Sequence, residues 1–334
     1  MLLKILGNKF KKFTDYFWSF FLFLILGIAM FLSGYLFAWE KTSVYFENDG
    51  QEKHESGYRF ISPLLECGSE PSNRKSLLEM DKALSEYIDE EIAKGTIEHA
   101  SVYWRDLNNG PWIGINEKEL FSPASLMKVP IMIAYLKAAE KNPYLLQQEI
   151  TIDDRVIDNK KQNILHADRI KIGETYTIQE LIERMITKSD NFAANALIFY
   201  ECGVDINKVS DDLRIFLPND ENAENFISVI DYASYFRVLY NSSYLNREMS
   251  EWALKLLSQT DFKEGLVAGV PSYVTVSHKF GERGLPDYYQ LHDCGIVYRS
   301  NSPYLLCIMT KGDSFKKMEE VISELSSRIY NNKY

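Results

Sequence analysis

The segment FSPASLMKVPIMIAYL, residues 121–136, joins a polar turn to an apolar run and predicts a buried helix over about 124–140. Ser125 and Lys128 lie three residues apart at its start, so they share one face of that helix. A serine hydroxyl is a poor nucleophile until a base takes its proton, and a lysine with a lowered pKa can serve as that base. The segment therefore predicts a nucleophile and its base on one rigid, buried element.

The Ser-x-x-Lys pattern is weak by itself, since this chain contains three copies of it. The copy at Ser72 lies in a polar stretch where nothing would desolvate the lysine. The copy at Ser314 opens the last expected helix, where a serine is typical of a helix cap. The copy at Ser125 precedes an apolar helix, and it is therefore the candidate for catalysis.

Two further motifs follow along the chain. Ser189-Asp190-Asn191 stands between the helical runs LIERMITK and FAANALIF, where a hydroxyl and an amide can pass protons and hold a substrate amide. A plain helix junction with an Asp or Asn cap is the alternative interpretation. Lys279 and Gly281, in the sequence HKFG, end an expected strand, where a cation beside a glycine can hold a ligand carboxylate. An edge-strand lysine that limits aggregation is the alternative there.

Helical and strand-like patterns are segregated along the rest of the chain. A helix and a hairpin precede the segment, a long helical stretch follows it, and strands with a closing helix end the chain. This order is typical of an α/β fold of the α+β type, an antiparallel sheet flanked by helices with an inserted all-α lobe. The expected helices are 76–94, 124–140, 191–201, 229–240, 247–258 and 313–331, with another opened by a capping box at Thr177; the expected strands are a hairpin around 108–110 and the runs 273–280, 291–299 and 304–310.

Taken in order, the three motifs resemble the Ser-x-x-Lys, Ser-Asp-Asn and Lys-Thr-Gly signature of class A β-lactamases and penicillin-binding proteins. The resemblance covers about residues 75–330 and implies the β-lactamase/transpeptidase-like fold, a five-stranded antiparallel sheet with an all-α lobe and the site between them. It implies catalytic roles for Ser125, Lys128 and Ser189, and substrate-binding roles for Asn191, Lys279, Gly281 and Glu282.

By this resemblance Ser125 is the acylated nucleophile, Lys128 is its base, and Ser189 relays a proton to the leaving nitrogen. Asn191 contacts the substrate amide and Lys279 holds the substrate carboxylate. The backbone N–H of the nucleophile is one oxyanion donor, and the second is expected just after the third motif.

Two departures from the family pattern bear on function. Phe280 replaces a hydroxyl that contacts the ligand carboxylate in the family, a loss of about 1.5–3 kcal/mol that Arg283 is placed to offset in part. The stretch after Ser189 is shorter than in class A β-lactamases and lacks a clear Glu-x-x-Leu-Asn, whose glutamate activates the deacylating water. Glu221, four residues before Asn225, is the candidate deacylation base, with plain surface charge as the alternative. Without such a base an acyl-enzyme would form and persist.

Residues 16–39 contain no charged side chain and are long enough to span a bilayer as one helix. Four lysines and one acid precede them, so the positive-inside rule leaves the N-terminus in the cytoplasm and exports the rest. A cleaved signal peptide is the alternative, although an Ala-x-Ala-like cleavage site is missing. The expected parts are a basic N-terminus at 1–15, an anchor at 16–39, a spacer at 40–74 whose apolar run docks on the domain, and the hydrolase domain at 75–334.

The net charge, the histidine spacing and the lack of other motifs disfavour several other classes of function. The net charge of −10 disfavours nucleic acid as a partner. The five histidines show no metal-ligand spacing, and the chain has no Gly-x-Ser-x-Gly elbow, P-loop or GxGxxG, so neither metal nor cofactor is expected. Cys294 and Cys307 lie in two strand-like runs joined by a short turn, as candidate neighbours on one sheet face; Cys67 and Cys202 have no obvious partner, and the sequence leaves the disulfide state open.

The sequence therefore predicts a membrane-anchored, extracytoplasmic serine hydrolase acylated at Ser125 by β-lactams or by acyl-D-Ala-D-Ala-like amides. A penicillin-binding D,D-peptidase that acts on peptidoglycan stem peptides and deacylates slowly is the alternative among enzymes. A third interpretation, from another class of function, is a catalytically silent module that binds wall peptides through the same cleft. Phe280 and the short loop favour the silent module, and the intact serines and lysines of the three motifs disfavour it.

Overall fold

The computed structural model describes residues 53–66, 74–108, 110–157, 169–200, 202–218 and 223–332, together with Gly27 and Met30. The chain divides into two units, Met1–Gly50 with Ser69–Pro71 and Gln51–Gly68 with Ser72–Tyr334, and the fold below belongs to the second unit. The expected anchor at 16–39 lies outside the described residues except for Gly27 and Met30. Within the described ranges, no helix combines the length and the apolar character that crossing a bilayer requires.

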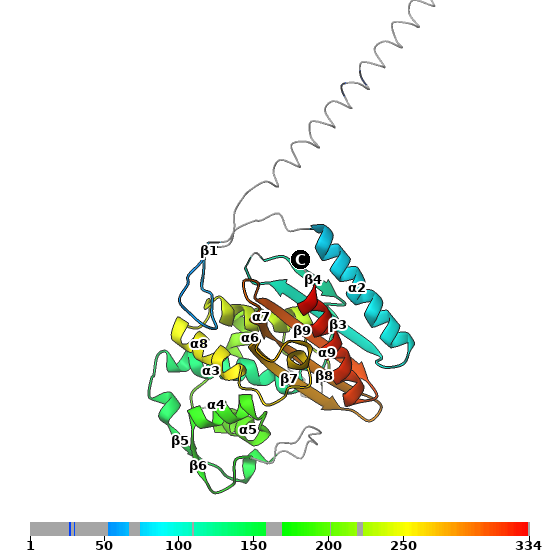
Figure 1. Ribbon diagram of the computed structural model, residues 1–334. Coiled ribbons are helices and arrows are strands. Elements are labelled where there is room, and N and C mark those ends of the chain that lie inside the picture. Colours follow the sequence, from blue (N-terminus) through cyan, green and yellow to red (C-terminus); the bar gives the residue numbers. More distant parts are fainter. Residues whose placement is uncertain are drawn as a thin grey trace, which may run out of the picture. The chain divides into compact units, whose positions relative to one another are not determined.

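An antiparallel sheet forms the centre of the fold, with the strand order β4-β3-β9-β8-β7 (Figure 1). Its strands are β3 (His99–Asp106), β4 (Trp112–Ile115), β7 (Val276–Gly284), β8 (Tyr289–Val297) and β9 (Tyr304–Gly312). The N-terminal hairpin joins the C-terminal meander where β3 pairs with β9, from His99 opposite Lys311 to Asp106 opposite Tyr304. β7 pairs only with β8 in this sheet, so it is an edge strand.

Helices cover both faces of this sheet (Figure 1). On one face α2 (Arg74–Ala93), α9 (Phe315–Asn331) and the short helix η4 (Leu266–Gly269) pack against the strands. On the other face α7 (Val229–Tyr240) contacts β9, β3 and β8. The inserted lobe contains η1 (Ala124–Met127), α3 (Lys128–Ala139), η2 (Leu145–Gln147), η3 (Asp154–Val156), α4 (Ile178–Thr187), α5 (Asn191–Tyr200), α6 (Lys208–Asp212) and α8 (Arg247–Leu257).

Each face of the sheet has its own hydrophobic core. One core joins α3, α4, α5, α7 and α8 to the sheet, and the other lies between the sheet and α2, α9 and η4. Local sequence signals fix these elements: α4 begins with the predicted capping box, in which Thr177 Oγ1 accepts the Glu180 N–H at 3.2 Å and Glu180 Oε2 accepts the Thr177 N–H at 2.8 Å. The predicted α+β fold with a five-stranded antiparallel sheet is confirmed.

The lobe differs from the prediction in one respect, since it is not entirely helical. β5 (Glu149–Thr151) pairs with β6 (Thr175–Thr177), with Ile150 opposite Tyr176. The pairing satisfies backbone groups of two connecting segments while it buries Ile150 in the lobe core. Such a ladder joins residues far apart in sequence, which an analysis of local patterns does not detect.

Part of the expected spacer is fastened to the domain. Residues 58–62, which we call the strap, follow β1 (Lys53–His54) and precede β2 (Leu64–Glu66). The side chains of Phe60 and Ile61 are buried, and the Glu251 carboxylate on α8 accepts the N–H groups of Arg59 at 3.1 Å, Phe60 at 3.0 Å and Ile61 at 3.0 Å. The Tyr298 hydroxyl donates to the Phe60 carbonyl at 2.9 Å. The apolar run therefore docks on the domain as predicted.

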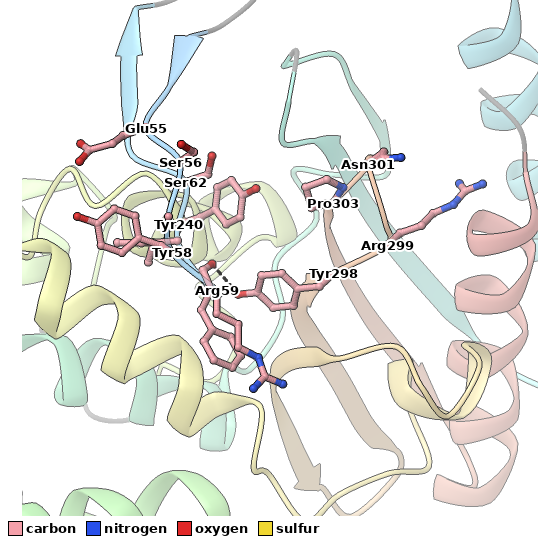
Figure 2. Close-up of a pocket in the computed structure, with 13 residues that line it drawn as sticks. Glu55, Ser56, Tyr58, Arg59, Ser62, Tyr240, Tyr298, Arg299, Asn301 and Pro303 are labelled. Carbon is pink, nitrogen blue, oxygen red and sulfur yellow. Dashed lines mark hydrogen bonds between the residues drawn. The ribbon is translucent and has the colours of Figure 1, made fainter.

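A cavity of about 320 Å³ lies beside the strap, between it and the turn that follows β8 (Figure 2). Tyr240, Tyr298 and Pro303 contribute to its wall, together with backbone of the strap. None of the residues predicted to carry chemistry lines it. The cavity is thus separate from the site formed by the three sequence motifs.

The structure also answers the question left open for two cysteines. Cys294 on β8 lies directly opposite Cys307 on β9, with their Cα atoms 3.9 Å apart, and the two form a disulfide. Both are buried in the core that faces the lobe. Cys202 is free, and Cys67 lies outside the described residues.

Candidate active site

Ser125 lies in η1, the short turn that leads into α3. Ala124 has φ of 46°, a left-handed conformation that costs a non-glycine residue roughly 1–2 kcal/mol. Two contacts hold the turn in place: the Leu126 N–H donates to the Pro123 carbonyl at 2.9 Å, and the Tyr232 hydroxyl of α7 donates to the Leu126 carbonyl at 2.9 Å. The half-buried Ser125 is therefore presented from a fixed, strained turn.

Lys128, the first residue of α3, lies at the centre of the site and is buried. Its Nζ atom is 3.1 Å from Ser125 Oγ, as the spacing of three residues predicts. The same Nζ donates to the Ser189 carbonyl at 2.7 Å and to Asn191 Oδ1 at 2.6 Å, and it lies 3.2 Å from Ser189 Oγ. The first and second motifs are therefore joined through one lysine.

The second motif forms the turn between α4 and α5. Ser189 has φ of 53°, and this left-handed residue lets the chain reverse so that its carbonyl and hydroxyl both face Lys128. Asp190 is buried and stabilises the turn from within: its carboxylate accepts the Phe192 N–H at 2.9 Å and the Ile170 N–H at 2.8 Å. Asp190 thus caps α5, as the alternative interpretation of this motif as a capped helix junction predicts. The neighbouring Ser189 and Asn191 face the site.

Lys279 reaches the same group of atoms from β7. Its Nζ donates to Ser189 Oγ at 3.0 Å and to the Phe280 carbonyl at 2.9 Å, and its side chain is fully buried. Burial and then the neighbouring Lys128 lower the pKa of Lys279 well below its usual range, whereas Asp293 and Glu282 raise it. Ser189 Oγ therefore connects two lysine side chains that approach it from different elements.

Gly281 and Glu282 follow on β7. A Cβ atom on Gly281 would lie 2.9 Å from the Pro123 carbonyl oxygen and 3.0 Å from Leu126 Cγ, so only glycine lets β7 pack this closely against the nucleophile turn. Glu282 is half-buried and lies opposite Leu291 on β8. The structure therefore brings Ser125, Lys128, Ser189, Asn191 and Lys279 into one hydrogen-bonded group, with Gly281 against the turn and Glu282 next along the strand.

The position of Phe280 changes the interpretation of the third motif. Its ring is 1% exposed and stacks on Phe262, with centroids 4.3 Å apart and planes 23° apart. Lys279 Nζ lies 4.2 Å from the centre of the same ring. A buried ring presents almost no surface to a ligand, so Phe280 offers no contact in place of the missing hydroxyl. Phe280 is a core residue that also supports Lys279 through a cation–π contact.

The segment after the expected short loop is tied to the far end of β7 and β8. Asn225 Oδ1 accepts a hydrogen bond from Gln290 Nε2 at 2.9 Å, and Glu224 pairs with Arg283 at 3.4 Å. Arg283, proposed to compensate for the missing hydroxyl, is therefore engaged by an acidic side chain. Glu221 lies outside the described residues, and its role as a deacylation base stays a prediction.

Two supporting residues carried no signal in the sequence. Gln290 Oε1 accepts the Ser122 N–H at 2.9 Å, and His292 Nε2 lies 2.9 Å from the Ser122 carbonyl, so β8 holds the start of the nucleophile segment from both sides. Burial lowers the pKa of His292 to about 4, so the ring stays neutral and donates through Nε2.

Within the described residues, no group of three or more His, Cys, Asp or Glu side chains is arranged to hold a metal ion.

A serine held against a lysine, at the junction of a sheet and a helical lobe, defines a class of protein, the serine hydrolases that form an acyl-enzyme. The model of the beta-lactamase enzyme family matches residues 83–332. The chain therefore belongs to that family, and it is a serine hydrolase that acts through an acyl-enzyme.

Solved structures show the same fold. The chain is similar to a protein named PBP-A, with 22% identity, a TM-score of 0.65 and coverage of 76% of this chain and 95% of the other. A mutant of PBP-A, described as an acyl-enzyme complex with penicillin G, matches with 22% identity, a TM-score of 0.64 and coverage of 76% and 96%. A β-lactamase from Chitinophaga pinensis matches with 20% identity, a TM-score of 0.64 and coverage of 75% and 98%. At these identities the likeness is one of fold.

Proposed function

We propose that Ser125 is the residue acylated in this enzyme, and that β-lactams and acyl-D-Ala-D-Ala-like amides are the acyl donors. The observation that carries the proposal is the distance of 3.1 Å between Lys128 Nζ and Ser125 Oγ inside a buried hydrogen-bond network. The Ser-x-x-Lys copy at Ser314 supports it by contrast. Ser314 caps α9 by accepting the Lys317 N–H, and Ser72 lies outside the described residues.

The geometry supports a definite sequence of proton transfers. Lys128 takes the proton of Ser125 Oγ, and the oxygen attacks the carbonyl carbon of the amide. The bond from that carbon to nitrogen then breaks, and Ser189 Oγ gives its proton to the leaving nitrogen. Ser189 recovers a proton from Lys128, whose Nζ lies 3.2 Å away. The product is an ester on Ser125. The proton that left Ser125 has in effect passed through Lys128 and Ser189 to the leaving amine, and both of these side chains end with the protons they began with.

Substrate recognition is assigned to the residues that surround this path. The Asn191 side chain is held by Lys128 and is placed to contact the substrate amide. Lys279, whose buried Nζ atom contacts Ser189 Oγ and the Phe280 carbonyl, is assigned to the substrate carboxylate. A ligand carboxylate beside it would favour the protonated form of the lysine.

A second candidate is a penicillin-binding D,D-peptidase that acts on peptidoglycan stems and releases its acyl group slowly. Two contacts favour it. Asn225, the counterpart of the asparagine in the deacylation segment, is bonded to Gln290, and the adjacent Glu224 is paired with Arg283. Both side chains are thus directed to the end of β7 and β8 rather than toward Lys128. Slow deacylation follows if Glu221 also fails to activate a water.

We further propose that the enzyme is exported and anchored by residues 16–39, with the N-terminus in the cytoplasm. The uncharged run and the four lysines before it support this topology. The disulfide between Cys294 and Cys307 adds support, because disulfides persist in oxidising compartments and are rare in the cytosol.

The decisive experiment follows the intact mass of the full chain over time after addition of benzylpenicillin. Ser125→Ala removes the proposed nucleophile, and Ser314→Ala is the matched control, since it alters another Ser-x-x-Lys copy that serves as a helix cap. We expect an adduct in the wild type and in Ser314→Ala, and none in Ser125→Ala. An adduct that persists for hours supports the D,D-peptidase, whereas one that clears as drug is hydrolysed supports a true β-lactamase. Adduct formation by Ser125→Ala, or stoichiometric binding of wall peptides without any adduct in the wild type, would overturn the proposal.

A further inference from the structure

A short segment between α8 and η4, residues 260–262, contacts the third motif on β7, and we call it the tie. The buried Thr260 hydroxyl lies 2.9 Å from the carbonyl oxygen of His278, the residue before the motif lysine. The Phe262 ring stacks on Phe280, the residue after that lysine, with centroids 4.3 Å apart. Both end residues of the tie are therefore fixed to the strand that carries the third motif.

The middle residue of the tie, Asp261, contacts the second motif instead. Its N–H donates to the Thr187 carbonyl at 2.9 Å, and its Oδ2 atom accepts a hydrogen bond from Lys188 Nζ at 2.7 Å. Thr187 and Lys188 are the last residue and the C-cap of α4, and Ser189 follows them directly. The tie is therefore bound both to the strand of Lys279 and to the helix end that presents Ser189.

The contact that this arrangement controls is the hydrogen bond of 3.0 Å between Lys279 Nζ and Ser189 Oγ. Ser189 has a left-handed φ of 53°, and such a residue keeps its conformation only while its surroundings enforce it. The Asp190 carboxylate holds the α5 side of this turn through the Phe192 N–H. The tie holds the α4 side, through Asp261.

The ion pair of Lys188 and Asp261 differs from the rest of the tie in its exposure. The two side chains are 36% and 38% exposed, whereas Thr260 and Phe262 are buried. Ion pairs at the surface contribute little to global stability. We therefore expect the buried contacts to keep the tie on β7 when the pair is removed, so that only the end of α4 loses support.

We propose that Lys188 and Asp261 are positioning residues whose ion pair holds Ser189 against Lys279, and that the pair thereby sets the preference of the enzyme for acyl donors with a free carboxylate. The inference rests on the proposed roles of Ser189 as proton donor to the leaving nitrogen and of Lys279 as the binder of the donor carboxylate. A donor whose carboxylate lies at Lys279 needs Ser189 at a fixed distance from that lysine, because both residues act on it at once. A donor without the carboxylate does not depend on this distance.

Four variants and their combination separate this role from a structural one. Lys188→Met removes one charge of the pair and keeps a long side chain, and Asp261→Asn removes the other with little change in shape. Lys188→Arg keeps the charge. Lys208→Met is the matched control, because Lys208 forms an ion pair of 2.8 Å with Asp212 on α6, outside the three motifs. A double variant of Lys188→Met and Asp261→Asn tests whether the two residues act together.

The measurement is the second-order rate constant of acylation of the full chain by benzylpenicillin and by its methyl ester, which has no free carboxylate. In Lys188→Met and in Asp261→Asn we expect the ratio of the two rate constants to fall by about two- to fivefold, the range that corresponds to the measured free energies of exposed ion pairs. The double variant should lose no more than either single variant, since the same pair is broken in all three. Lys188→Arg and Lys208→Met should keep the ratio of the wild type, and all variants should unfold close to its Tm.

An unchanged ratio in either single variant, or an equal loss of rate with both donors, would overturn the inference. A double variant in which the two losses multiply would also overturn it, because the residues would then act separately. Failure of the proposed function looks different: the wild type would form no adduct at Ser125, or would react equally well with both donors.

Discussion

Replacement of Phe280 by threonine restores the hydroxyl of the family motif, and the structure predicts that it damages the enzyme. The ring is 1% exposed, stacks on Phe262 at 4.3 Å and lies 4.2 Å from Lys279 Nζ. Loss of a buried phenylalanine costs about 3–5 kcal/mol in the free energy of unfolding. About 0.5–1.5 kcal/mol of this comes from the pair of rings. For a domain of this size the change corresponds to roughly 6–20 °C in Tm.

The assay is thermal unfolding of the full chain in mild detergent, followed by near-UV circular dichroism, together with the rate of acylation by benzylpenicillin. Phe262→Leu is the matched control, because it disrupts the same ring pair without removing the ring next to Lys279. We expect both variants to lose stability, and Phe280→Thr alone to lose acylation rate as well. A Phe280→Thr protein that unfolds within about 1 kcal/mol of the wild type and acylates faster would refute this reasoning.

Three further predictions concern parts of the fold outside the reacting group. Burial lowers the pKa of His292 from 6.5 to about 4, so its contribution to stability is full above pH 6.5 and is lost as the pH falls toward 4. His292→Gln keeps a donor for Ser122 and should reduce the loss of unfolding free energy between pH 6.5 and 4 by about 3 kcal/mol. Unfolding curves in which the wild type and the variant lose the same free energy over this range would contradict the prediction. Glu251→Ala should speed tryptic cleavage after Arg59 about tenfold by releasing the strap, whereas exposed Glu248→Ala should not. Reduction of the β8–β9 disulfide should lower unfolding stability by about 2–4 kcal/mol, and an unchanged Tm under reductant would argue that the bond is not formed.

Much of the architecture was predictable because its signals are local. The capping box at Thr177 and the turn between β3 and β4 each depend on residues a few positions apart. Features that depend on distant partners could not be predicted in this way. The β5–β6 ladder pairs Ile150 with Tyr176, and the location of Phe280 depends on Phe262, which stands in a loop before η4. Neither contact leaves a periodic trace in the sequence.

The candidate site likewise combines contacts that the local sequence predicts with contacts that depend on distant segments. The spacing within the first motif is enough to bring Ser125 and Lys128 together, since three residues make nearly one helical turn. The convergence of all three motifs follows from the family pattern and is confirmed by the hydrogen bonds of Ser189. The residues that support them, such as Gln290, act through contacts with segments far away in the chain. Their importance is therefore visible only in three dimensions.

The arrangement of the two lysines bears on how a ligand carboxylate would be bound in the proposed function. Ser189 Oγ lies 3.0 Å from Lys279 Nζ and 3.2 Å from Lys128 Nζ, so two full positive charges at this hydroxyl would repel each other strongly in a buried site. Burial and the neighbouring Lys128 accordingly lower the pKa of Lys279 well below its usual range. In the proposed function, a substrate carboxylate beside Lys279 would oppose this shift, because a nearby opposite charge favours the protonated form of a lysine.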